Sequence, residues 1–223
     1  MTDQWDLRKL SIPNVDTTSN LLLHRTQIER LQNANINVLV SSISGAGLAD
    51  SAFDNLLEPL FRKFRVPFSV HKTSSKTSHK EFLKGIGFSN SKEHIIVVFG
   101  GDTLVFDVLN SILENPGSTE GPQITLCPVP CGTGNALATS LGINTVPIGI
   151  SRIFGLAKTA SGLVPLPILR IRISETGREQ VIYAAVVCSW GLHASLVADS
   201  DDPEMRRQYG PQRFQVQGFF GIA

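Results

Sequence analysis

The sequence carries little charge and almost no net charge. Only 17% of its 223 residues are charged, and 20 Lys and Arg against 19 Asp and Glu give a formal net charge of +1. Proteins that bind nucleic acid usually carry a surplus of Lys and Arg to neutralise phosphates, so we expect no nucleic-acid partner. Because 42% of the residues are hydrophobic, we expect a globular chain with a sizeable core rather than a disordered one.

Cysteine is scarce, and long apolar runs are absent. The three cysteines, Cys127, Cys131 and Cys188, are odd in number and lack metal-ligand spacing, so we expect buried, reduced thiols and no metal site. No run reaches the ~18 consecutive apolar residues of a membrane-spanning helix. The N-terminal MTDQWDLRKL also lacks the apolar region of a signal peptide. These absences predict a cytoplasmic protein that can bind a membrane surface peripherally but does not cross it.

From Ile36 onward, short apolar strands alternate with helical patterns, which predicts β-α units and a parallel sheet. The strand HIIVVFGG is apolar on successive residues, as expected when both faces are covered. Pro59 falls inside the first predicted helix and should kink it or restart it at Glu58. The predicted strands are residues 36–44, 67–73, 94–101 and 124–130.

The pattern changes on either side of these units. Residues 1–33 form a lead segment with one predicted helix and no recognisable chemistry. After a predicted helix from Pro147 to about residue 160, two alternating segments flank the turn SETGRE, which predicts an antiparallel hairpin and a second domain. The predicted domains are therefore residues 1–33, 34–162 and 163–223.

Three glycine-containing turns each follow a predicted strand and precede a predicted helix. Carboxyl ends of parallel strands meet at one edge of a sheet, where backbone N–H groups at helix starts can bind phosphate. The pattern therefore predicts a nucleotide site. Structural alternatives are an N-cap role for Asp102 and a turn role for Asn135. The turns are Ser44-Gly45-Ala46-Gly47, Gly100-Gly101-Asp102 and Gly132-Thr133-Gly134-Asn135.

Other polar residues give weaker signals. Neither His79 nor His193 has a nearby serine, cysteine or carboxylate pattern that indicates a catalytic triad, so we expect structural or surface positions. The group Arg206, Arg207 and Arg213 is either a solvated helix face or a set of guanidinium forks for phosphate oxygens. Spacing alone favours the solvated face.

The segments IIVVFGGDTLVFDVLNSI and VPCGTGNALATSLG resemble the catalytic domain of the diacylglycerol kinase family. The later segment SWGLHASLVADSDDPEMRRQYGPQRF is similar to its sphingosine and ceramide kinase branch. The resemblance covers about residues 36–223 and implies an α/β fold like that of NAD kinase and phosphofructokinase, followed by the start of an incomplete antiparallel lipid-binding domain. It also implies ATP and Mg²⁺ as cofactors and phosphate transfer to a lipid hydroxyl of a sphingoid base, diacylglycerol or ceramide at a membrane surface. Whether the chain forms a homodimer is left open.

By position in these motifs, the resemblance implies a role for individual residues. Asp102 is the implied general base, and Ser195, Asp199 and Asp201 are implied to lie near the lipid. No residue is assigned as a metal ligand. Phosphoryl transfer depends mainly on positioning the two substrates and neutralising the phosphate charge. A general base together with residues that contact the nucleotide and the lipid is sufficient for this. The residues implied to contact the nucleotide are Ser44, Gly45, Gly47, Thr73, Gly100, Gly101, Asp107, Gly132, Thr133, Gly134, Asn135, Arg206 and Arg213.

The sequence also departs from the family pattern. Thr103 stands where the family has a glycine, and a β-branched residue tolerates positive φ badly, which predicts damaged catalysis in an intact fold. Ser41-Ser42 replaces Asn-Pro, and Ser195 replaces an aspartate near the lipid. The family continues beyond the end of this chain, which predicts C-terminal truncation. The alternatives are a non-catalytic or weakly active nucleotide- or lipid-binding relative and a soluble-substrate kinase related to NAD kinases.

Overall fold

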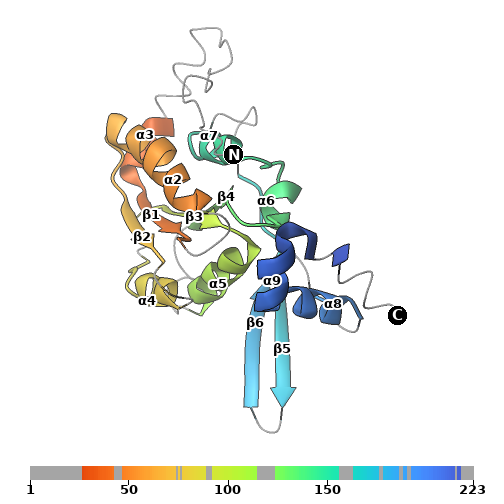
Figure 1. The fold of residues 1–223 in the computed structure, drawn as a ribbon. Coiled ribbons are helices and arrows are strands. Elements are labelled where there is room, and N and C mark those ends of the chain that lie inside the picture. Colours follow the sequence, from red (N-terminus) through yellow and green to blue (C-terminus); the bar gives the residue numbers. More distant parts are fainter. Residues whose placement is uncertain are drawn as a thin grey trace. The chain divides into compact units, whose positions relative to one another are not determined.

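A computed structural model gives the fold of the chain (Figure 1). The chain divides into two compact units, Met1–Ala185 and Val186–Ala223. The residues that the structure describes are 27–42, 47–73, 75, 77–88, 92–114, 124–155, 163–175, 178–185, 188–189, 192–213 and 215–216.

The first unit is built on a four-stranded sheet in the order β2-β1-β3-β4 (Figure 1). All three strand pairs are parallel, as predicted. Every residue of β3 is buried, so the expectation of a strand covered on both faces is confirmed. The strands are β1 (Asn35–Val40), β2 (Ser69–Lys72), β3 (His94–Gly100) and β4 (Ile124–Pro130).

Helices cover both faces of this sheet because successive side chains of a strand point to opposite sides. On one face Val97 and Phe99 of β3 pack with the helices between β1 and β2 and with α7. On the other face Ile96 and Val98 pack with α4, α5 and α6. Residues 27–33 are also helical. The helices of this unit are α2 (Leu48–Ala52), α3 (Glu58–Lys63), α4 (Ser78–Lys84), α5 (Asp102–Leu113), α6 (Ala136–Ser140) and α7 (Val146–Ile153).

Pro59 shapes the helix between β1 and β2. A π-helical turn, η2 (Phe53–Leu57), separates α2 from α3, and the Glu58 N–H donates to the Phe53 carbonyl five residues earlier. Proline has no N–H and its ring clashes with the carbonyl four residues before it, which the wider turn relieves. The predicted restart at Glu58 is therefore confirmed.

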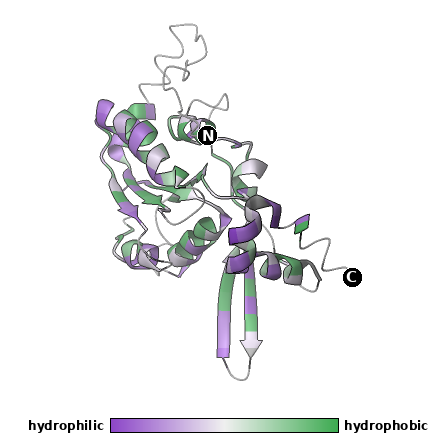
Figure 2. Cartoon of the chain, in the orientation of Figure 1, coloured by the Kyte–Doolittle hydropathy of each residue, from purple (hydrophilic) through white to green (hydrophobic). Residues whose placement is uncertain are grey.

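The predicted hairpin consists of β5 (Leu169–Glu175) and β6 (Arg178–Ala184). They pair antiparallel, with Arg170 opposite Tyr183. Figure 2 shows β6 passing from hydrophilic at its Arg178 end to hydrophobic near Ala184, which is buried. The hairpin belongs to the first unit. The domain boundary near residue 162 stays a prediction.

The second unit contains α8 (Leu192–Ser200), α9 (Pro203–Tyr209) and the 3-10 turn η3 (Gly210–Gln212). Asp202 starts α9, because its carboxylate accepts N–H bonds from Glu204 at 2.9 Å and Met205 at 3.2 Å. In the described parts of both units, no helix has the length and apolar character needed to span a membrane. The helix predicted to reach about residue 160 ends at Ile153, and residues 156–162 lie outside the described part.

Candidate functional site

Gly101 and Gly132 lie against each other at the carboxyl edge of the sheet. A Cβ added to Gly132 would stand 2.4 Å from the Gly101 Cα, and one added to Gly101 would stand 3.1 Å from the Gly132 Cα. Beside them the Cys131 N–H donates to the Gly100 carbonyl at 3.1 Å, so the pairing of β3 with β4 continues into the turns. The second and third predicted turns therefore touch, and their contact requires glycine.

Asp102 links the same two turns through its side chain. One carboxylate oxygen accepts the N–H of Ala136 at 2.8 Å, and the other accepts the N–H of Leu137 at 3.0 Å. These donors belong to the first turn of α6, whereas Asp102 is the first residue of α5. Asp102 is thus an N-cap of a helix 34 residues further along the chain, not of its own helix.

Asn135 holds the turn after β4 in shape. Its backbone is left-handed, with φ 51° and ψ 40°. Its side-chain oxygen accepts the Gly132 N–H at 2.9 Å, and its side-chain nitrogen donates to the Gly132 carbonyl at 2.7 Å. Asparagine tolerates this conformation better than most residues. The turn role considered for Asn135 is therefore present.

The hydrogen bonds of Asp102 determine which backbone N–H groups at the helix starts can still bind a ligand. Asp102 already accepts the N–H groups of Ala136 and Leu137, so the start of α6 does not offer them to phosphate. No side chain caps α5, a helix of 12 residues. The N–H groups of Thr103 and Leu104 in its first turn have no partner within the helix, and this end carries partial positive charge. The start of α5 is consequently the stronger anion site of the two.

The positive φ considered for Thr103 is absent, and the expectation of damaged catalysis stays a prediction. Thr103 lies in the first turn of α5 and is exposed. Among the described non-glycine residues, positive φ occurs only at Arg65 and Asn135. Because α5 already begins at Asp102, the next residue takes a helical φ that threonine adopts readily.

The turn after β1 is described only at its ends. Residues 43–46, which include Ser44 and Gly45, lie outside the described part of the chain. Gly47 has a φ of +73°, in the left-handed region that favours glycine. On the neighbouring strand, the Thr73 N–H donates to the Val40 carbonyl at 2.8 Å. The Thr73 hydroxyl is buried and has no hydrogen-bond partner in the described structure, which leaves it available to a ligand.

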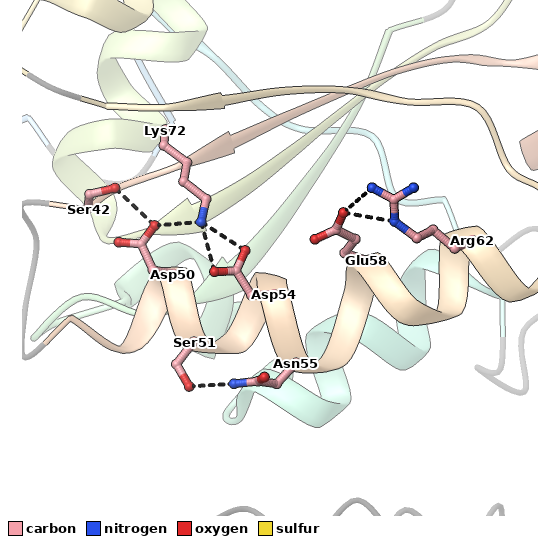
Figure 3. Close-up of polar contacts among 8 residues, drawn as sticks. All are labelled: Ser42, Asp50, Ser51, Asp54, Asn55, Glu58, Arg62 and Lys72. Carbon is pink, nitrogen blue, oxygen red and sulfur yellow. Dashed lines mark hydrogen bonds and ion pairs between the residues drawn. The ribbon is translucent and has the colours of Figure 1, made fainter.

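A polar network joins the ends of β1 and β2 to α2 and to η2 (Figure 3). The Ser42 hydroxyl bonds to the Asp50 carboxylate at 3.1 Å. The Lys72 ammonium lies 3.2 Å from Asp50 and donates to both oxygens of Asp54 at 2.8 Å. The hydrogen bond with Asp54 raises the pKa of Lys72, which keeps this lysine charged. The network fixes both flanks of the first glycine turn.

Asp107 contacts α4. Its Oδ2 lies 3.6 Å from Nε2 of His79, a buried residue in the first turn of α4. Burial lowers the pKa of His79, and burial also raises the pKa of Asp107. The structural position expected for His79 is confirmed. The nucleotide contact expected for Asp107 stays a prediction.

Sequence reasoning missed the contact made by Asn110. Its side-chain nitrogen donates to the Tyr183 carbonyl at 2.9 Å, and its side-chain oxygen accepts the Tyr183 N–H at 2.8 Å. The same nitrogen also donates to the Phe106 carbonyl at 2.8 Å. The available signal was an asparagine between the apolar residues Leu109 and Ile112, since a polar residue on such a stretch of helix often has a partner outside it.

The second unit holds the remaining predicted residues. Arg213 is buried, donates to the Gly210 carbonyl at 2.9 Å and lies 3.4 Å from the Asp201 carboxylate. Ser195 and Asp199 lie on α8 and are exposed. Arg206 lies on α9. The roles expected for these residues toward nucleotide and lipid stay predictions.

A hollow of about 740 Å³ lies away from the turns, at the amino-terminal side of β2. It contains none of the predicted site residues. Ligands of open α/β sheets bind at the carboxyl edge, so the glycine turns remain the candidate site. The hollow is lined by Gln32, Phe61, Arg62, Arg65, Val66, Pro67 and Phe68.

A parallel α/β domain with touching glycine turns at its carboxyl edge is typical of nucleotide-binding proteins. Residues 35–161 match the diacylglycerol kinase catalytic domain, and the chain belongs to this family. It is 29% identical over 197 residues to sphingosine kinase 1 of Rattus norvegicus, covering 83% of this chain and 48% of that protein. It is 28% identical to sphingoid long-chain bases kinase 1 of Arabidopsis thaliana, covering 82% of this chain and 23% of that protein.

The chain spans less than half the length of these two relatives. Among solved structures, a diacylglycerol kinase from Bacillus anthracis str. Sterne matches with a TM-score of 0.43 and 16% identity. That match covers 68% of this chain and 60% of the bacterial chain.

Proposed function

We propose that this chain is the nucleotide-binding part of an ATP-dependent lipid kinase that phosphorylates the hydroxyl of a sphingoid base. The observation that carries the proposal is the contact between Gly101 and Gly132, closed by the carboxylate of Asp102. The sphingosine kinases among the relatives support a sphingoid base as the substrate. Diacylglycerol and ceramide are the other two lipids to test.

The residues at the turns fit the phosphates of ATP. The first turn of α5 supplies backbone N–H groups, and the absence of side chains at Gly101 and Gly132 lets the turn after β4 lie against the start of this helix. No group of three or more His, Cys, Asp or Glu that could hold a metal occurs among the residues described. Mg²⁺ usually binds through one or two carboxylates together with substrate phosphates, so we assign Mg²⁺ to the bound nucleotide rather than to a protein cage.

Asp102 can link the turns and act as the general base at the same time. Each carboxylate oxygen has two lone pairs, and each uses one of them for a backbone N–H. When bound, ATP supplies the phosphoryl group that is transferred. Asp102 would accept the proton of the lipid hydroxyl on a remaining lone pair as that hydroxyl oxygen bonds to the γ-phosphorus and the bond between this phosphorus and ADP breaks, with ADP as the leaving group. The two N–H bonds keep the carboxylate in one orientation for this step.

The test uses Mg-ATP labelled at the γ-phosphate and vesicles that contain sphingosine, diacylglycerol or ceramide. We expect label on sphingosine with the parent chain. Gly132→Ala should lose it, because the new Cβ would lie 2.4 Å from the Gly101 Cα. Gly87→Ala is the matched control, since a Cβ there meets no atom within 4 Å. A folded parent chain that labels none of the three lipids would refute the proposal.

A second candidate function is nucleotide binding without phosphoryl transfer. The observation that favours it is the use of both Asp102 oxygens by the start of α6. This function predicts that the parent chain binds a fluorescent ATP analogue and that Gly132→Ala weakens the binding, while no lipid is labelled. Lipid labelling by the parent chain would contradict it.

A further inference from the structure

One side chain joins the hairpin β5–β6 to helix α5. The amide of Asn110 bonds to both the N–H and the carbonyl of Tyr183 in β6, at 2.8 Å and 2.9 Å. An antiparallel neighbour makes the same pair of bonds to an edge strand. Asn110 therefore takes the place of a strand residue beside β6 and fixes that strand to the helix.

Helix α5 connects this pairing to the glycine turns. It starts at Asp102, which caps α6, and Asn110 follows eight residues later, about 12 Å along the axis at 1.5 Å per residue. Between them, Asp107 lies 3.6 Å from His79 of α4. Hydrogen bonds of Asp102 and Asn110 thus join α5 to α6 at its start and to β6 in its later turns.

The hairpin carries apolar side chains that face solvent. Leu169 is 55% exposed and Ile173 is 38% exposed, and Val164 in the segment before β5 is 71% exposed. Apolar side chains of this kind can contact the hydrocarbon chain of a lipid. Their distance from Asp102 depends on how the hairpin is held against α5.

We propose that Asn110 is a positioning residue that sets the hairpin β5–β6 relative to Asp102 and so places a lipid hydroxyl at the glycine turns. This inference rests on the proposed function as a lipid kinase. Asn110 itself contacts neither nucleotide nor lipid. It acts through Tyr183 on one side and through α5 on the other.

The test compares three variants of the full chain with the parent. Asn110→Asp keeps the size and the acceptor for the Tyr183 N–H, but it loses the donor and places a carboxylate oxygen against the carbonyls of Tyr183 and Phe106. Asn110→Ala removes the pairing with Tyr183 without adding charge, and it replaces Asn110→Asp in the comparison if that variant does not fold. Ser111→Ala is the control, because the Ser111 hydroxyl donates to the Asp107 carbonyl of its own helix at 2.8 Å.

Two quantities are measured: hydrogen exchange of the Tyr183 amide, and the KM values for ATP and for sphingosine in vesicles. For the Asn110 variants we expect exchange about tenfold faster and a sphingosine KM raised by about fivefold or more, with the ATP KM within about twofold of the parent value. Ser111→Ala should match the parent. Unchanged exchange, or an equal rise in both KM values, would overturn the inference.

The two proposals fail in different ways. If the parent chain phosphorylates no lipid, the proposed function is wrong, and the pairing is then decided by hydrogen exchange alone. Protection of Tyr183 in the parent and Ser111→Ala chains, lost in both Asn110 variants, would still support the part of the inference in which Asn110 holds β6 to α5. Equal protection in all four chains would contradict it.

Discussion

Replacing Asp102 by alanine is expected to loosen the junction between the glycine turns as well as to remove the proposed base. The substitution leaves the N–H groups of Ala136 and Leu137 without their acceptor. Loss of an N-cap costs about 0.5–2 kcal/mol. Because the Ala136 bond is exposed to solvent, water can replace part of it, and we expect the free energy of unfolding to fall by about 1–2 kcal/mol.

Urea denaturation of three variants separates the two roles of Asp102. Asp102→Asn keeps one acceptor oxygen and should lose about half as much stability as Asp102→Ala, roughly 0.5–1 kcal/mol, yet it should lose all lipid labelling because a neutral amide cannot take the proton. Thr103→Ala, at the exposed neighbouring residue, should keep the stability of the parent. If Asp102→Ala unfolds at the same urea concentration as the parent, the linking role is wrong. If Asp102→Asn labels lipid normally, the base role is wrong.

Three further outcomes are expected. The pKa of His79 is lowered by burial, so its contribution to stability is present above about pH 6.5 and is lost as pH falls toward the folded pKa. The free energy of unfolding of His79→Gln, measured by urea denaturation, should therefore fall less between pH 7.5 and pH 6 than that of the parent. The raised pKa of Asp107 acts in the opposite direction, because burial favours the protonated carboxyl in the folded chain. Thr103→Gly and Thr103→Ala should have equal activities in the lipid assay, because position 103 has no positive φ to relieve, and a gain with glycine alone would contradict this. Cys188 is exposed, so the expectation of buried thiols is wrong for that residue. Burial raises the pKa of Cys131 to about 12. Iodoacetamide at pH 8 should therefore modify Cys188 in the folded chain and reach Cys131 only after denaturation, as peptide mass spectrometry would show.

The strands and the order of the units could be predicted because their signals are local. β3 has successive apolar residues, and a strand of this kind must be covered on both faces. The hairpin follows from alternation around a turn. The reciprocal bonds of Asn135 with Gly132 span only three residues, so a turn role for Asn135 was also accessible from the sequence.

The contacts that define the candidate site are not local, and sequence alone did not give them. The carboxylate of Asp102 reaches α6 only because β3 and β4 are neighbours in the sheet. Asn110 pairs with Tyr183 across 73 residues. The positive φ considered for Thr103 arose from assigning a backbone conformation by residue type, when the start of α5 determines φ there.

The central claim is that the touching turns at Gly101 and Gly132 form one nucleotide site, and the dissociation constant of Mg-ATP tests it most directly. Calorimetric titration should show binding by the parent chain and by Gly87→Ala. Binding should be weaker by at least about tenfold in Gly132→Ala, whose Cβ cannot fit against Gly101. A folded parent chain that binds no Mg-ATP, or a folded Gly132→Ala chain that binds it as tightly as the parent, would contradict the claim.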